Sequence, residues 1–481
     1  MTHFTSLFRK LSGFGQTQDA PKAKAADRSF ASEYAQTDAA PQQAVSDAPH
    51  THSVFPDLRP CDSGRRVFHA KPAYQPTTAP TPKPHKTTPP KTTTNNAAPT
   101  NLSIPCPDPT GEERTRDHHQ NRALKLARQE DWEALSGLIR AADQSNEMTP
   151  GGMSVAELMA FGARADVVLA VEHALLDRTP ERDAPLLRGI EALEYVLAEN
   201  SDDYVIGCIV AQTHMDMAWS WRGIGWDVEI APRNREAFDA HFSRARDIVA
   251  GFAGRHETSA LMASTGCALM RGDKCSTKSV ADRYEALIDL NPLNIAPLRA
   301  LGTHMLPRWY GSHAQLELEA RRTAARTQDV WGAGAYAWVM FDAISVDDMA
   351  CAQLDLPFFI EGLHDIVARR PEPHTINLLA AYCANTMGQA FSGNDDADHI
   401  RAQIAACADW IVREHLTELH PMIWAHAAQG FANNLRVASA TRFAAAGQDD
   451  ALRIIAGLFR REIAEGKQII FTDQGVVATP A

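Results

Sequence analysis

The densest group of side chains that could do chemistry lies between residues 213 and 226. It combines one histidine, one acid, one arginine and three tryptophans: His214, Asp216, Trp219, Trp221, Arg222 and Trp226. Clustered tryptophans can stack on a ligand or a peptide. Packing between helix layers explains them as well, and we favour that interpretation. On a helix, His214 and Asp216 point in roughly opposite directions, so the spacing disfavours a catalytic His–Asp pair.

A second candidate is the segment Leu306–Ser312. Pro307 cannot donate a helical hydrogen bond, so a helix should end just before it, and Ser312 is suited to cap the next helix. Between them stand Arg308, Trp309 and Tyr310. These residues form either an exposed recognition loop or a wedge in which Trp309 packs between helices and Arg308 bonds nearby carbonyls. We slightly favour the wedge.

Motifs for metal binding or catalysis are weak. Glu361 and His364 have the E-x-x-H spacing of di-iron bundles, but the motif occurs once, and a D-x-x-H variant at Asp396–His399 does not replace the second copy. The chain has no G-x-S-x-G elbow and no phosphate-binding loop. We therefore predict no metal, no cofactor and no catalytic residue, and we lean against an enzyme.

One short pattern occurs twice. Thr213-His214-Met215 followed by Trp219 recurs as Thr303-His304-Met305 followed by Trp309, an offset of 303 − 213 = 90 residues. A duplicated helix pair is the simplest explanation. The predicted binding residues are accordingly His214, Trp219, Trp221, Arg222, His304, Arg308, Trp309 and Tyr310.

The elements that must position these side chains are helices. Apolar residues recur at helical spacing in Glu112–Ala142 and again in stretches of about 12–25 residues beyond the turn-forming segment Thr149–Gly152. No alternating strand pattern occurs before Ile469–Val477, which is short and terminal. We predict an all-α domain over residues 112–470, followed by a flexible C-terminus at 471–481.

Two segments resemble known proteins. Ala286–Asn294, which reads Ala-Leu-Ile-Asp-Leu-Asn-Pro-Leu-Asn, resembles the junction between consecutive tetratricopeptide repeats. The resemblance covers the junctions only and implies a tetratricopeptide-like superhelix of helix pairs. Leu306–Ser312 is similar to a Pro-Arg-Trp-Gly-Gly-Ser segment of an uncharacterised group of bacterial helical proteins, although Tyr310 replaces a glycine. That group implies no activity.

The N-terminal part differs from this domain. Of 28 prolines, 16 lie in residues 1–111, which contain no tryptophan, so residues 16–111 should form a disordered linker. Met1–Gly15 has apolar residues at helical spacing beside Arg9 and Lys10. It is either a short basic amphipathic helix with weak membrane-surface or partner contact, or simply a disordered end, which we favour.

Charge and cysteines narrow the function. Residues 1–111 hold 12 of the 47 basic and 8 of the 59 acidic residues, so the remainder carries 35 basic against 51 acidic side chains. This balance argues against a nucleic-acid-binding surface. The eight cysteines form no C-x-x-C pair and should be free thiols in a reducing cytoplasm. We see no signal peptide and no transmembrane span.

Two functions from different classes remain open. The first is a non-enzymatic protein–protein interaction or scaffold module that binds another protein on an open groove of stacked helix pairs. The alternative is an enzyme or small-ligand-binding helical domain with a site around His214, Arg308 and Trp309. A closed pocket where titratable groups meet would favour the alternative. The sequence leaves the oligomeric state open.

Overall fold

A computed structural model describes residues 101–175, 188–223, 230–270, 277–431 and 439–480. All of these residues belong to one unit of the chain. Our predictions for Met1–Gly15, for most of the linker and for Trp226 lie outside the described residues.

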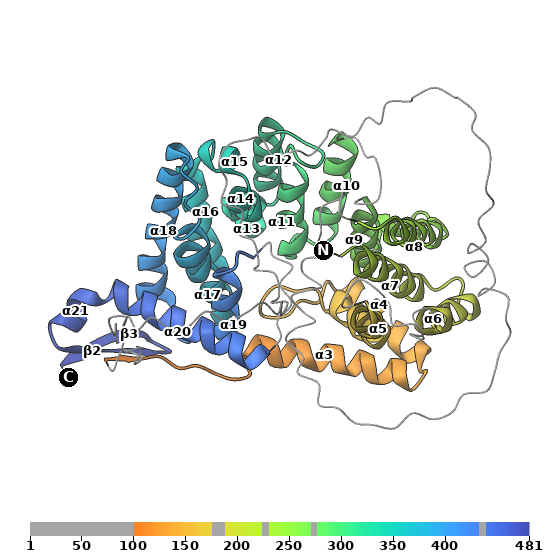
Figure 1. The fold of residues 1–481 in the computed structure, drawn as a ribbon, viewed down its shortest axis with the longest axis horizontal. Coiled ribbons are helices and arrows are strands. Elements are labelled where there is room, and N and C mark those ends of the chain that lie inside the picture. Colours follow the sequence, from red (N-terminus) through yellow and green to blue (C-terminus); the bar gives the residue numbers. More distant parts are fainter. Residues whose placement is uncertain (1–100, 176–187, 224–229, 271–276, 432–438, 481) are drawn as a thin grey trace, which may run out of the picture. The chain divides into compact units, whose positions relative to one another are not determined.

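Helices dominate the described residues (Figure 1). In chain order they are α3 (Gly111–Arg128), α4 (Trp132–Gln144), α5 (Val155–Ala174), α6 (Arg188–Glu199), α7 (Tyr204–Arg222), α8 (Pro232–Ala250), the 3-10 turn η2 (Arg255–Glu257), α9 (Ala260–Leu269), α10 (Thr277–Leu290), α11 (Ile295–His304), α12 (His313–Arg326), α13 (Gln328–Trp331), α14 (Gly334–Val346), α15 (Asp348–Ala352), α16 (Leu356–Arg369), α17 (Pro373–Ala381), the π-helical segment η4 (Tyr382–Met387), α18 (Asp395–His415), α19 (Pro421–Ala427), α20 (Ala440–Leu458) and α21 (Arg460–Ala464). The mostly helical fold that the sequence predicts is therefore confirmed.

Local sequence signals set where many helices begin. Thr110 and Glu113 form a reciprocal capping box at the start of α3. The region Glu112–Ala142 is two helices, because Glu130 adopts a φ of 58° and Asp131 then caps α4. Ser312 caps α12, as predicted, by accepting a hydrogen bond from the Gln315 backbone amide.

Buried apolar side chains form two clusters. One runs from Ala123 to Leu269 and lies within α3 to α9, and the other runs from Ala263 to Phe471 and lies within α9 to β2. Helix α14 lies deep in the second cluster, since its residues from Gly334 to Phe341 are all buried. It packs against α11, α12 and α16, while α18 packs against α17 and α16 (Figure 1).

Helices α11 and α14 approach each other closely at one glycine. A Cβ atom built on Gly302 would lie 1.7 Å from the carbonyl oxygen of Val339. No side chain fits there unless the two helices separate. The resulting contact holds the α11 residues that follow Asn294 in a fixed position relative to α14.

The C-terminal segment, which we expected to be flexible, forms part of a small sheet. Strand β1 (Leu102–Ser103) pairs in parallel with β2 (Lys467–Thr472), which pairs antiparallel with β3 (Gly475–Pro480). Ile469 and Phe471 are buried on one face of β2, and the Phe471 ring packs edge-on against Phe459. Burial of this alternating apolar face explains why the segment forms a strand.

Candidate functional site

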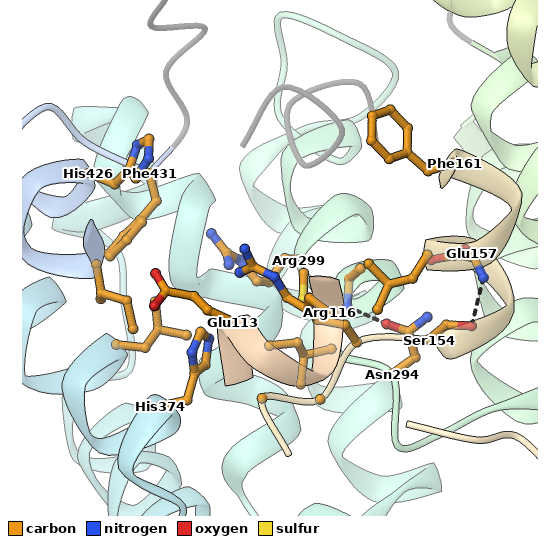
Figure 2. A pocket seen from close by; sticks show the side chains of 18 of the residues that line it. Glu113, Arg116, Ser154, Glu157, Phe161, Asn294, Arg299, His374, His426 and Phe431 are labelled. Carbon is orange, nitrogen blue, oxygen red and sulfur yellow. Dashed lines mark hydrogen bonds between the residues drawn. The ribbon is translucent and has the colours of Figure 1, made fainter. Parts of the chain in front are cut away.

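The described residues form a cavity of about 150 Å³ that is lined by residues from seven helices, α3, α5, α7, α9, α11, α17 and α19 (Figure 2). Its charged and histidine side chains are Glu113, Arg116, Glu157, Arg164, Asp216, Arg299, His374, His420 and His426. Its apolar lining includes Met153, Leu158, Phe161, Met215, Trp219, Ile295, Leu378, Met422, Ile423 and Phe431. The site therefore joins residues that are more than 300 positions apart (Glu113 to Phe431).

Two of the three cavity arginines are bonded to carboxylates of neighbouring helices. Arg164 on α5 donates to Asp216 on α7 at 2.8 Å, and the side chains of both are at most 7% exposed. Arg299 on α11 donates through Nε and Nη2 to both oxygens of Asp342 on α14, at 2.9 and 2.7 Å. Each pair neutralises its own charge, so these arginines link helices around the cavity.

Arg116 on α3 is in a different environment. Its side chain is buried, and Figure 2 shows it in the middle of the cavity with Glu113 nearby. Burial lowers the pKa of Arg116 by more than the carboxylates of Glu112, Glu113 and Asp117 raise it. Burial thus disfavours the charged form of Arg116, while the neighbouring carboxylates favour it.

His374 forms the adjoining wall, at the start of α17. Burial, together with the positive charges of His420 and Arg116, lowers the pKa of His374 to about 3, so the imidazole is neutral at neutral pH. Within the described residues its ring nitrogens make no hydrogen bond. One edge of the ring packs against Gly151. A Cβ atom built on Gly151 would come within 2.8 Å of the Cδ2 atom of His374, so a side chain at this position would clash with the ring.

His420 is fixed by its neighbours. Its Nε2 lies 2.9 Å from Oε1 of Glu418, and its backbone amide donates to Oδ1 of Asn377. Asn377 in turn donates through Nδ2 to the carbonyl oxygens of Pro373 and Glu418. These bonds tie the start of α17 to the segment before α19, and they fix the ring and backbone of His420.

Of the predicted binding residues, only Trp219 lines the cavity. Its ring packs edge-on against Phe238 and Phe242 of α8, and the guanidinium of Arg222 lies 5.6 Å from its centroid. Trp221 is buried in the core. Core packing thus explains Trp221. Trp219 packs against α8 on one side and lines the cavity on another.

His214 lies in a separate cluster with α6 and α8. Its Nε2 is 2.8 Å from Oε1 of Glu194, and its Nδ1 is 2.9 Å from Nδ1 of His241. Asp216 forms an ion pair with Arg164 of α5 instead. Burial raises the pKa of Glu194, but hydrogen bonds from Arg244 and His214 outweigh it and lower the pKa to about 2.

The second predicted group surrounds His304. His304 is buried, its Nδ1 lies 3.1 Å from the Tyr284 hydroxyl, and its ring stacks on Tyr310. Tyr310 donates to the carbonyl oxygen of Met270 at 2.5 Å. Trp309 is 41% exposed and Arg308 is also exposed, so Trp309 is not fully wedged between helices. None of these four residues lines the cavity.

The His214 cluster makes stability depend on pH. Burial and the charge of His214 lower the pKa of His241 to about 3, well below the ordinary value of about 6.5. Below pH 6.5 the unfolded chain binds a proton that folded His241 does not, so stability is full above pH 6.5 and falls toward pH 3. Urea unfolding should show a loss of about 1.4 kcal/mol between pH 7.5 and 5.5 from this group alone.

His241→Asn tests this dependence. Asparagine keeps a hydrogen-bonding group near the Nδ1 position but does not titrate, so the variant should lose about 1.4 kcal/mol less than the wild type over the same pH interval. His374, with a similarly lowered pKa, contributes to both proteins and cancels in the difference. Equal pH dependence of the two proteins would contradict a lowered His241 pKa.

The described residues contain no group of side chains arranged for metal binding, and burial leaves the Cys208 thiol unreactive. No three His, Cys, Asp or Glu side chains among them are grouped to hold a metal ion. His364 of the E-x-x-H motif stacks on Trp410, with centroids 4.1 Å apart.

Five predicted free thiols are confirmed as buried: Cys208, Cys267, Cys351, Cys383 and Cys407. Burial raises the pKa of Cys208 to about 12, which makes that thiol unreactive. Cys275 lies outside the described residues.

The cavity residues Arg116, Arg164, Arg299 and His374 were missed because they come from different helices. One signal was available for two of them. Arg164 and Arg299 stand within helical stretches that are rich in apolar residues, Val155–Ala174 and Ile295–His304. A charged residue in such a stretch is rarely buried without a partner, and so it marks a buried polar site.

Comparison of the chain with protein-family models, with curated proteins and with solved structures gives no match. The helices that the structure describes include none that is long and apolar enough to cross a membrane.

Proposed function

We propose that this chain is a small-ligand-binding protein whose cavity holds a small organic anion. The observation that carries the proposal is the buried guanidinium of Arg116, which lines an otherwise largely apolar cavity beside His374. This is the small-ligand class that the sequence left open, at a different place from the one predicted around His214, Arg308 and Trp309.

Charge favours an anion over a cation. Arg116, Arg164 and Arg299 bring three guanidinium groups to the cavity, and burial disfavours the charged form of Arg116. A carboxylate or phosphate entering the cavity would offset this desolvation through charge-assisted hydrogen bonds. Burial is the main cause of the lowered pKa of His374, and the charges of His420 and Arg116 add to it.

Size and lining favour a small ligand with an apolar body. A dry cavity of about 150 Å³ binds benzene in another protein. The aromatic side chains of Phe161, Trp219 and Phe431 and the thioethers of Met153 and Met215 offer matching surface. We therefore infer a carboxylate or phosphate attached to a single ring or a short alkyl chain.

Thermal unfolding of the full chain tests this proposal. Benzoate, phenylacetate and phenyl phosphate should raise the unfolding temperature, by about 2.7 kcal/mol of added stability at 100 times Kd, while benzylamine and benzyl alcohol should not. Arg116→Gln should abolish the shift. Arg128→Gln is the matched control, since Arg128 lies on the same helix in an exposed pair with Asp166. An equal shift with benzylamine, or an unchanged shift in Arg116→Gln, would refute anion binding.

We also propose that the helices form tetratricopeptide-like pairs. Matching contacts support this: His214 on α7 reaches Glu194 on α6, and His304 on α11 reaches Tyr284 on α10, each 20 residues upstream. Thr213 and Thr303 each donate to the carbonyl oxygen four residues earlier. Duplication of one helix pair accounts for both sets of contacts.

Protein–protein interaction stays a second proposed function. It is favoured by Trp309, which is 41% exposed beside Tyr310 in the connection between α11 and α12. Affinity capture with the wild type and Trp309→Ala would test it, with loss of one reproducible partner as the supporting result.

A reducing cytoplasm is the compartment that we propose, because the described cysteines are free thiols.

A further inference from the structure

The apolar lining of the cavity distinguishes the two kinds of ligand body that the proposed function allows, a ring and an alkyl chain. Three aromatic rings and three thioethers line it: Phe161, Trp219, Phe431, Met153, Met215 and Met422. Aromatic rings attract one another beyond the effect of the area that they bury, and methionine sulfur packs favourably at a ring edge. An alkyl chain gains neither of these contacts, so the lining favours an aromatic ring.

Phe431 stands at the end of a column of aromatic rings that begins in the core. Tyr382 of η4 stacks on Phe341 of α14, with centroids 3.7 Å apart and planes 20° apart, and both side chains are fully buried. The Phe341 centroid lies 6.0 Å from that of Phe431, which is the member of the column that lines the cavity. Figure 2 shows Phe431 at one side of the cavity and Phe161 at the other. A ligand ring packed against Phe431 would continue the column.

Neighbouring groups limit the positions that the Phe431 ring can take. Thr386 of η4 donates to the carbonyl oxygen of Ala427 at 3.0 Å, which ties the end of α19 to the core. Gly430 then adopts a φ of 77°, a left-handed conformation that suits glycine, and Phe431 follows directly. The guanidinium of Arg299 lies 5.9 Å from the centroid of the Phe431 ring. Part of the ordering that ligand binding would cost is therefore already made.

We infer that the ligand is an aromatic anion, whose aryl ring packs against Phe431 while its anionic group binds at the cavity arginines. The inference rests on the proposed function, because it assigns the apolar body of the same ligand. Burial of apolar area alone would favour a saturated ring over an aromatic ring of the same carbon number, since the saturated ring removes more hydrocarbon surface from water. A preference for the aryl ring therefore reports aromatic contacts and not hydrophobicity.

Calorimetric titration of the full chain at pH 7.5 tests the inference with phenylacetate, cyclohexylacetate and hexanoate. In the wild type, phenylacetate should bind about tenfold more tightly than either of the others, the effect of one or two aromatic pairs. Phe431→Leu removes the ring but keeps an apolar side chain, and it should reduce the preference to within about twofold. Phe391→Leu is the matched control, because Phe391 is 55% exposed and does not line the cavity, and it should keep the preference.

The outcomes separate this inference from the proposed function. Suppose that the acids bind and that Arg116→Gln weakens all three. If cyclohexylacetate then binds as tightly as phenylacetate, or if Phe431→Leu keeps the preference, the aryl assignment is wrong and anion binding stands. If no acid binds, both are wrong. Thermal unfolding checks that Phe431→Leu folds, and the comparison of phenylacetate with cyclohexylacetate in the wild type decides the question if it does not.

Discussion

We expect Arg299→Met to lower the free energy of unfolding by about 3–5 kcal/mol, the usual effect of breaking a buried ion pair from one side. The side chains of Arg299 and Asp342 are only 6% and 14% exposed. Without the guanidinium, Asp342 keeps a buried charge with neither of its two hydrogen bonds from Arg299. The variant also loses the contact of the guanidinium with the Phe341 ring, whose centroid lies 4.7 Å away.

Two further variants check that explanation by urea unfolding. Arg299→Met combined with Asp342→Leu should recover most of the lost stability, because neither charge is then buried alone. Arg128→Met breaks an exposed pair, in which both side chains are more than half exposed, and should cost less than about 1 kcal/mol. If the double variant is as unstable as Arg299→Met, then lost packing rather than an unpaired carboxylate causes the effect.

The second large effect is expected from a single methyl group. Gly302→Ala should lower the free energy of unfolding by about 3 kcal/mol, at the upper end of ordinary overpacking. The new Cβ would lie 1.7 Å from the Val339 carbonyl oxygen, and a backbone atom of a buried helix cannot turn aside as a side chain can. Helices α11 and α14 would have to move apart, which also displaces Arg299.

Gly137→Ala is the matched control, and its expected effect has the opposite sign. Gly137 is an exposed residue inside α4, and a Cβ there meets nothing within 4 Å. Alanine is favoured over glycine in a helix by up to about 1 kcal/mol, so this variant should be slightly more stable than the wild type. Equal effects of the two substitutions in urea unfolding would contradict the close approach at Gly302.

The sequence predicts those features of the fold that depend on neighbours in the chain. Helical periodicity, the break at Pro307 and the cap at Ser312 are local, and the structure confirms them. The strand at Ile469 was not predicted because its stability comes from pairing with Leu102 and from burial on distant residues. Its local pattern alone is too short to distinguish a strand from a flexible end.

The candidate site was hardly predictable for the same reason. Arg116, Arg299 and His374 come together only through tertiary packing, and no short motif contains two of them. Local clustering drew attention to His214 and Trp309, but only Trp219 from these clusters lines the cavity. The buried carboxylate partners of Arg164 and Arg299 are also distant, 52 and 43 residues away.

A crystal structure of the full chain soaked with phenylacetate tests the central claim most directly. We expect the carboxylate within about 2.7–2.9 Å of the Arg116 guanidinium, with the phenyl ring against the aromatic lining near Phe431. An acid bound elsewhere on the molecule, with this cavity empty at a saturating concentration, would contradict the proposed function.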